Sequence, residues 1–110
     1  MTFDYPDEIK RLPDADIPLD GVHGKLLQAG EQQIVFFAID PIGQIPPHAH
    51  GAQFGIMIDG EMELTVDGVT RRYGRGDTYY IPAGVTHSAT FLTKVHVMDL
   101  FAEPARYRAR

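Results

Sequence analysis

Residues 43–53 read Gly-Gln-Ile-Pro-Pro-His-Ala-His-Gly-Ala-Gln and hold two histidines two positions apart. On a β-strand, side chains at such positions lie on one face, with Cα atoms roughly 6.6 Å apart. The imidazoles of His48 and His50 can therefore reach one metal ion. Gln53 would lie on the opposite face of an unbroken strand, so the chain must bend at Gly51 and Ala52 if Gln53 is to join them.

A second stretch supplies a third histidine from a distant part of the chain. Residues 76–87 read Gly-Asp-Thr-Tyr-Tyr-Ile-Pro-Ala-Gly-Val-Thr-His. A strand is predicted to end at Pro82, a tight turn follows at Ala83 and Gly84, and His87 opens the next strand. A single histidine is more often a solvated side chain than a ligand. The two stretches together, in this order, indicate a metal site.

The sequence around both stretches alternates as short strands do. Glu61–Val66 alternates strictly, Asp67-Gly68 is a strong hairpin signal, and Val69–Tyr73 is the predicted partner strand. The β-branched and aromatic residues between Glu31 and Asp40 favour a buried strand. Further strands are predicted at Val22–Leu27, Phe54–Ile58, Thr78–Ile81, His87–Leu92 and Val95–Phe101. About eight short strands indicate an all-β barrel or sandwich.

Length and charge limit the possible functions. The chain has 110 residues, enough for one domain, and no cysteine, so disulfides do not stabilise it. Fifteen acidic residues against ten basic ones give a net charge of −5, which argues against binding to a phosphate backbone. No apolar run approaches the ~20 residues of a membrane helix, and the start of the chain is unlike a signal peptide. A cytoplasmic protein is expected.

Residues 1–20 do not follow the strand pattern. Pro6, Pro13 and Pro18 interrupt them, so they are predicted to form an irregular arm with one helical turn. Their apolar side chains are expected to pack on the barrel or on a partner subunit. Residues 21–110 are predicted to form a single barrel domain.

The two histidine stretches resemble the motifs of the cupins, which are small double-stranded β-helix barrels with a jelly-roll-like shape. The first motif runs Gly, five residues, His-x-His, three or four residues, Glu, six residues, Gly. The second runs Gly-x5-Pro-x-Gly-x2-His-x3-Asn. The matching positions are Gly43, His48, His50, Gln53, Gly60, Gly76, Pro82, Gly84 and His87. Gln53 replaces the glutamate, Phe91 replaces the final asparagine, and two spacings are shorter. The resemblance covers roughly residues 31 to 101 and implies an all-β double-stranded β-helix.

By this resemblance, one divalent metal ion is bound by His48, His50, Gln53 and His87. Imidazole-rich sites suit zinc, nickel, iron, manganese or copper, and the ligand types alone do not choose among them. Three neutral imidazoles and a neutral amide leave the full double charge on the ion, whereas a glutamate would cancel half of it. The site should therefore favour an anionic ligand and act as a strong Lewis acid.

An aspartate interrupts the apolar face of the last predicted strand. The alternation of Val95–Phe101 places Val95, Val97, Asp99 and Phe101 on one face and His96, Met98 and Leu100 on the other. A buried carboxylate without a partner is costly. Either this face opens to the mouth of the barrel, or Asp99 forms a structural ion pair with a cation such as Arg106.

The C-terminal tail also resembles that of small cupins that ketonise unsaturated uronates from pectin and alginate. In that group an Asp-x-Phe, a turn with a proline, and an arginine lie beside the metal; Asp99, Phe101 and Arg106 match these types, with the arginine one residue further along. The resemblance implies isomerisation or ketonisation of a sugar acid, in which Asp99 moves a proton, Arg106 pairs with the carboxylate and Phe101 contacts the substrate.

Two alternatives to this enzyme remain open at the level of sequence. One is a metal-dependent dioxygenase, and the other is a non-catalytic protein that binds a metal or a sugar acid. For any of the three, the expected ligand is a small molecule. A homodimer with two-fold symmetry is expected from the apolar arm and the face formed by His96, Met98 and Leu100.

Overall fold

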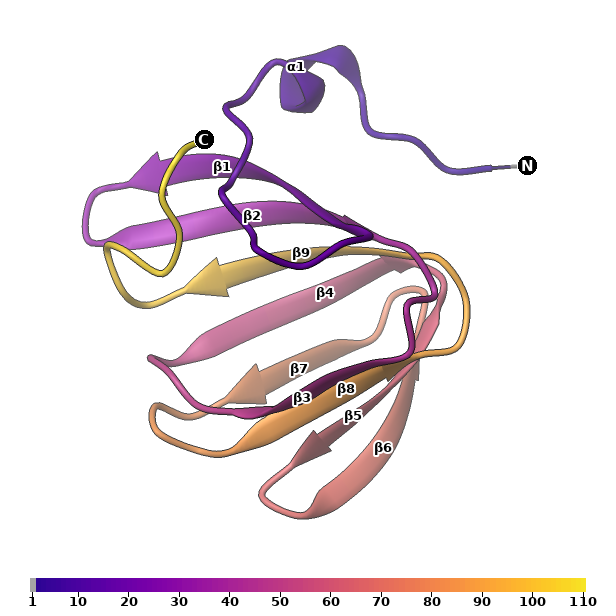
Figure 1. The fold of residues 1–110 in the computed structure, drawn as a ribbon. Helices are drawn as coiled ribbons and strands as arrows, with labels where there is room; N and C mark the ends of the chain where they lie inside the picture. Colours follow the sequence, from indigo (N-terminus) through magenta and orange to yellow (C-terminus); the bar gives the residue numbers. More distant parts are fainter. Residues whose placement is uncertain (1) are drawn as a thin grey trace.

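The computed structural model describes residues 2–110, which form two antiparallel β-sheets facing each other (Figure 1). One sheet has the strand order β1-β2-β9-β4-β7 and the other β3-β8-β5-β6. The elements are α1 (Asp7–Lys10), β1 (Val22–Ala29), β2 (Gln32–Ile39), β3 (Gln44–His48), β4 (Gln53–Asp59), β5 (Glu61–Val66), β6 (Val69–Gly74), β7 (Thr78–Ile81), β8 (His87–Phe91) and β9 (Val95–Phe101).

From β3 onward the chain crosses repeatedly between the two sheets. β3, β5, β6 and β8 belong to one sheet, whereas β4, β7 and β9 belong to the other. This alternation winds the chain as a double-stranded β-helix, so the predicted fold class is confirmed. The inward-facing side chains of both sheets form the core, and the most deeply buried apolar ones are Val35, Met57, Ile81, Val95, Val97 and Phe101.

The strands agree with the alternation in the sequence. β5, β7 and β9 have the predicted bounds, and the other predicted strands differ by one or two residues at their ends. At the hairpin between β5 and β6, Asp67 and Gly68 both have positive φ angles, 50° and 80°. These angles are those of the two-residue turn that the Asp-Gly pair predicts.

The structure adds one strand, so residues 2–110 contain nine strands where about eight were expected. The additional strand is β3, which includes Pro46 and Pro47. Proline lacks the N–H that a central strand needs, but β3 is an edge strand that pairs with β8 alone. Its register also shifts between Ile45 and His48, which leaves His48 directly opposite His87.

The N-terminal arm packs on its own barrel, beside the five-stranded sheet (Figure 1). It forms the single helical turn α1, and Tyr5, Ala15 and Ile17 are buried. The Tyr5 hydroxyl donates a hydrogen bond to the carbonyl of Phe37 over 2.6 Å. The rings of Phe3 and Tyr5 lie edge-on to His96, with centroids 4.9 and 5.4 Å away. The arm therefore covers His96, one of the residues expected to face a partner.

Within residues 2–110, no helix has both the length and the apolar character needed to cross a membrane.

Candidate metal centre

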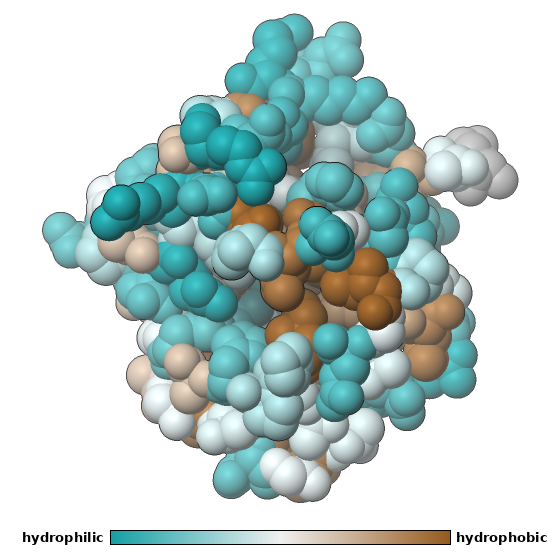
Figure 2. Space-filling view, viewed as in Figure 1, coloured by the Kyte–Doolittle hydropathy of each residue, from teal (hydrophilic) through white to brown (hydrophobic). Residues whose placement is uncertain are grey.

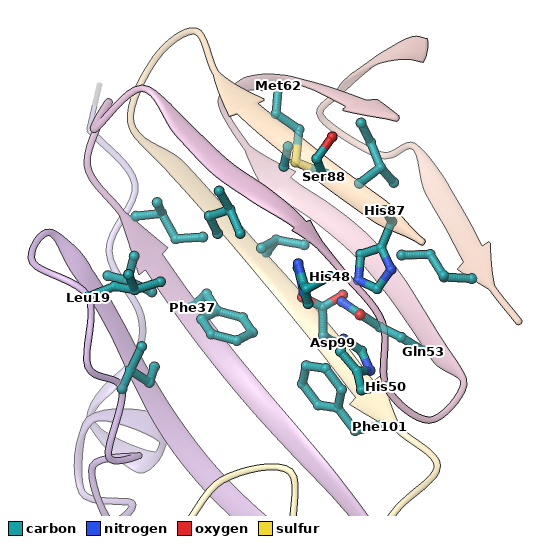
Figure 3. A pocket seen from close by; sticks show the side chains of 18 of the residues that line it. Leu19, Phe37, His48, His50, Gln53, Met62, His87, Ser88, Asp99 and Phe101 are labelled. Carbon is teal, nitrogen blue, oxygen red and sulfur yellow. The ribbon is translucent and has the colours of Figure 1, made fainter. Parts of the chain in front are cut away.

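Three histidines meet at one end of the space between the sheets (Figure 3). Their ring centroids are 4.2 Å apart for His48 and His87, 4.8 Å for His50 and His87, and 5.3 Å for His48 and His50. The nitrogen atoms they could offer to a metal all lie within 4.8 Å of one another. The structure therefore brings together the three histidines that the two sequence stretches indicated.

The histidines come together in a different way from that predicted, which was a shared strand face for His48 and His50. Strand β3 ends at His48, and His50 lies in the loop that follows, so the two do not share a strand face. Instead, the pairing of β3 with β8 places His48 opposite His87, and the loop brings His50 to them. The bend expected at Gly51 is present, and it lets Gln53 begin β4 at the same end of the barrel.

Backbone carbonyls fix the orientation of all three imidazole rings. The Nδ1 atom of His48 lies 3.0 Å from the carbonyl oxygen of Pro46, that of His50 2.8 Å from Gly51, and that of His87 3.0 Å from Val85. A carbonyl oxygen only accepts, so each Nδ1 must carry the hydrogen. Each Nε2 is then left with a free lone pair, as a metal ligand requires.

Burial favours the neutral form of the His50 and His87 imidazoles. Loss of solvent lowers the pKa of His50 and of His87 below the ordinary histidine value, and hydrogen bonds to the backbone only partly oppose this. A neutral imidazole is the state that binds a metal ion, so the burial of His50 and His87 favours metal binding.

Gln53 offers a fourth ligand atom. Its side chain is buried in the same cavity, and its Oε1 has no hydrogen-bond partner within residues 2–110. A buried carbonyl oxygen without a partner is costly, and coordination to a cation would satisfy it. Three Nε2 atoms and this oxygen are a donor set that fits a divalent ion.

Asp99 lies in the same cavity and is 3% exposed (Figure 3). Tyr79 donates a hydrogen bond from its hydroxyl to Oδ1 of Asp99 over 2.6 Å. Burial raises the pKa of Asp99 to about 6, although hydrogen bonds from Tyr79 and Gln53 act in the opposite direction. Of the two alternatives from the sequence, the face that opens into the barrel is therefore correct, and the ion pair with Arg106 is absent from residues 2–110.

Gly55 makes room for the pair formed by Tyr79 and Asp99. It lies on β4 between its register partners Tyr79 on β7 and Asp99 on β9. A β-carbon at Gly55 would lie closer than 3.0 Å to the Tyr79 ring and to Oδ1 of Asp99. The two side chains thus meet across a glycine, and neither Tyr79 nor Gly55 was identified from the sequence. The available signal was the spacing of Tyr79 and Ile81, which fall on one face of the predicted strand 78–81, and the structure buries that face.

Arg106 lies in the loop after β9 and also lines the cavity. Its Cζ lies 4.5 Å from the centroid of the Tyr107 ring and 5.9 Å from that of Phe101. Its Nε is buried and has no hydrogen-bond partner in the described part of the chain. A guanidinium that lies against two aromatic rings and has an unused donor is suited to bind an anion. Phe101 also packs edge-on against His50, with ring centroids 5.6 Å apart.

The cavity has a volume of about 100 Å³ and runs between the two sheets. Its polar end holds His48, His50, Gln53, His87, Asp99 and Arg106, and the rest is lined mostly by aliphatic and aromatic side chains. In the space-filling view, hydrophobic residues gather near the middle of the face and hydrophilic residues surround them (Figure 2). Small polar molecules can therefore be held at one end of an otherwise apolar interior.

Comparison with known proteins gives consistent matches. The cupin domain model matches residues 35–101. The H2HPP isomerase of Bacillus subtilis is 30% identical over 73 residues, which are 64% of this chain and 31% of that relative, so the match spans about a third of its length. KdgF from Halomonas sp. is 28% identical, with a TM-score of 0.73 over 84% of this chain and 87% of that one. An RmlC-like cupin from Shewanella frigidimarina is 27% identical, with a TM-score of 0.76 over 96% and 93%.

Proposed function

The chain belongs to the cupin family, and on that premise we propose that it is a metal-dependent isomerase that ketonises a small anionic substrate, a sugar acid. One observation carries this proposal: the buried carboxyl of Asp99 shares a cavity with three histidines whose Nε2 atoms are free. A carboxyl group that can move a proton beside a metal centre is what an enol-to-keto conversion requires. The curated relative is named an isomerase, and the KdgF neighbour fits the resemblance of the C-terminal tail.

The metal would be held by His48, His50, His87 and Oε1 of Gln53. When bound, a divalent ion such as zinc, nickel, iron, manganese or copper would act as a Lewis acid that polarises the substrate oxygens. The Gln53 amide carries no charge and burial favours neutral His50 and His87, so these ligands would leave the charge of the bound ion to attract an anion. Arg106 adds a further positive charge to the cavity, and its unused Nε–H is available to the carboxylate of the substrate.

Asp99 would transfer the proton. Ketonisation forms a C–H bond at one end of the double bond and releases the proton of the enol oxygen, so one group that both gives and takes a proton can serve. Oδ1 of Asp99 accepts the hydrogen bond of Tyr79, which leaves Oδ2 to exchange this proton with the substrate. Phe101 forms the apolar wall beside the metal end of the cavity.

The experiment is a spectroscopic assay with 4,5-unsaturated galacturonate and its alginate-derived counterpart. Protein stripped of metal by a chelator is compared with protein reloaded with each candidate ion. We expect an acceleration over the spontaneous reaction that is lost on stripping and restored by one of the ions. Oxygen uptake in its place would identify a dioxygenase, and tight binding without turnover would identify a binding protein. Either result would contradict the isomerase.

We also propose that the chain forms a homodimer through the outer face of the five-stranded sheet. Register partners place Leu27, Ile34, Leu100, Phe54 and Tyr80 in one apolar row across the outer face of all five strands. Leu27, Phe54 and Tyr80 are exposed. Apolar rows of this extent commonly mark protein interfaces, and two-fold symmetry is the commonest arrangement.

Sedimentation equilibrium at micromolar concentration tests this proposal. The expected mass is twice that of the 12.3 kDa chain. Phe54→Lys should give monomers, whereas Val69→Lys, at an exposed apolar position on the β5–β6 hairpin, should leave the dimer intact. A 12.3 kDa species for the unaltered chain would refute the dimer.

A further inference from the structure

The loop after β9 links the arginine of the cavity to the loop that carries His50. The first of these, the Arg106 loop, comprises residues 102–107; the second, the His50 loop, comprises residues 49–52. The backbone N–H of Ala102 donates to the carbonyl of Ala52 over 2.9 Å. The two loops are therefore joined where the Arg106 loop begins.

Glu103 makes the second connection between the loops. Its Oε1 accepts a hydrogen bond from the backbone N–H of Gly51 over 2.9 Å and lies 3.5 Å from Nδ1 of His50. A β-carbon at Gly51 would be only 3.0 Å from the same oxygen, so a larger residue there would push the carboxylate away by a few tenths of an ångström. The carboxylate thus lies against the backbone of the His50 loop rather than in the cavity.

The hydrogen bond from the Gly51 N–H to Glu103 holds the residue whose carbonyl orients the His50 ring. The carbonyl of His50 accepts from the N–H of Gly84 over 2.9 Å, and the N–H on the other side of the same peptide bond donates to Glu103. The next carbonyl, that of Gly51, accepts the hydrogen bond of Nδ1 of His50. Fixing Gly51 therefore fixes the direction in which Nε2 of His50 points.

The far end of the Arg106 loop is held independently of Glu103. Gln33 is 1% exposed, and its Nε2 donates to the carbonyls of Tyr107 over 2.8 Å and Pro104 over 3.2 Å. Its Oε1 accepts from the N–H of Tyr107 over 3.0 Å. Because Gln33 and Ala52 hold the loop by other bonds, removing the side chain of Glu103 should leave the loop in place.

We propose that Glu103 is a positioning residue of the metal centre, which fixes His50 through the N–H of Gly51. The same loop also places Arg106 in the cavity, so one short segment aligns both the metal ligand and the anion-binding group. This inference rests on the proposed metal site, but it does not depend on the identity of the substrate or on turnover.

The test compares Zn²⁺ affinities of purified, folded apo-protein by competition with a chromophoric chelator. Glu103→Ala removes the acceptor, and we expect affinity to fall by about 10–100-fold, the usual effect of removing a group that orients a ligand. Glu103→Gln keeps an oxygen at the same reach, and its affinity should stay within about threefold of the unaltered chain. Glu31→Ala makes the same change of charge at an exposed position in the β1–β2 turn and should leave affinity unchanged.

Thermal unfolding of the apo-proteins separates positioning from folding. We expect all four proteins to unfold cooperatively at similar temperatures, with only Glu103→Ala weak in Zn²⁺ binding. An unchanged affinity for Glu103→Ala, or an equal loss in Glu103→Gln, would overturn the role assigned to this hydrogen bond. Failure of the unaltered chain to bind Zn²⁺ or any of the other candidate ions, nickel, iron, manganese and copper, would overturn it together with the metal centre, whereas binding without turnover would contradict only the isomerase.

Discussion

Replacing Gly55 with alanine should disrupt the contact that places Asp99 in the cavity. Gly55 has an ordinary extended backbone, so alanine is permitted by conformation and only space decides the outcome. The added methyl group would lie closer than 3.0 Å to both the Tyr79 ring and Oδ1 of Asp99. Neither Tyr79 nor Asp99 can move freely, because both are buried and they are hydrogen-bonded to each other.

Gly55→Ala should lower the free energy of unfolding in two ways, and the two contributions add. Overpacking a filled interior costs about 1–3 kcal/mol. Separating Tyr79 from Asp99 leaves buried polar groups without partners, at about 1–3 kcal/mol more. The free energy of unfolding should therefore fall by about 2–6 kcal/mol, a large share of the ~5–15 kcal/mol typical of a whole domain.

Urea denaturation followed by circular dichroism measures this change, and Gly74→Ala is the matched control. Gly74 also lies in a strand without a positive φ, but the nearest atom to a β-carbon there is 3.9 Å away. Gly74→Ala should be neutral or stabilise by up to about 1 kcal/mol, because alanine restricts the unfolded chain. If Gly55→Ala were as stable as Gly74→Ala, the packing described between Tyr79 and Asp99 would be wrong.

Three further substitutions separate the roles proposed in the cavity. His87→Ala should remove most bound metal, measured by elemental analysis, while the β-type circular dichroism is kept. An undiminished metal content would show that His87 is not a ligand. Asp99→Asn should retain metal but lose about 10²–10⁴-fold in kcat, because asparagine keeps the shape without exchanging the proton. Arg106→Ala should chiefly raise KM, by about 10–100-fold for the loss of a charged hydrogen bond. A shared loss of metal in the last two variants would mean that Asp99 and Arg106 support the fold instead.

The strands could be predicted from sequence wherever one face is buried. In β5 the pattern of apolar residues at every second position follows directly from that burial, and the predicted bounds of β5 and β9 are those of the structure. β3 was missed because Pro46 and Pro47 are unfavourable in central strands. Its place at a sheet edge, which makes them tolerable, depends on the pairing of the whole chain.

The candidate site was only partly predictable, for a related reason. The histidines and Gln53 fall in short motifs with fixed spacing, so the sequence could indicate them together. The hydrogen-bond partner of Asp99 is Tyr79, twenty positions earlier in the sequence. Tyr79 lies on β7, which pairs with neither β6 nor β8, the strands next to it in the chain. Glu103 reaches Gly51 across 52 positions. Such contacts arise from strand order in the folded sheet, and no local pattern in the sequence encodes them.

Binding of one divalent ion by four named side chains can be seen in a crystal structure with anomalous diffraction at the absorption edge of the bound metal. We predict a single anomalous peak within bonding distance of Nε2 of His48, His50 and His87 and of Oε1 of Gln53, with each Nδ1 still bonded to its backbone carbonyl. The absence of a peak in protein crystallised with the ion, or a peak bonded through Nδ1, would rule out this coordination.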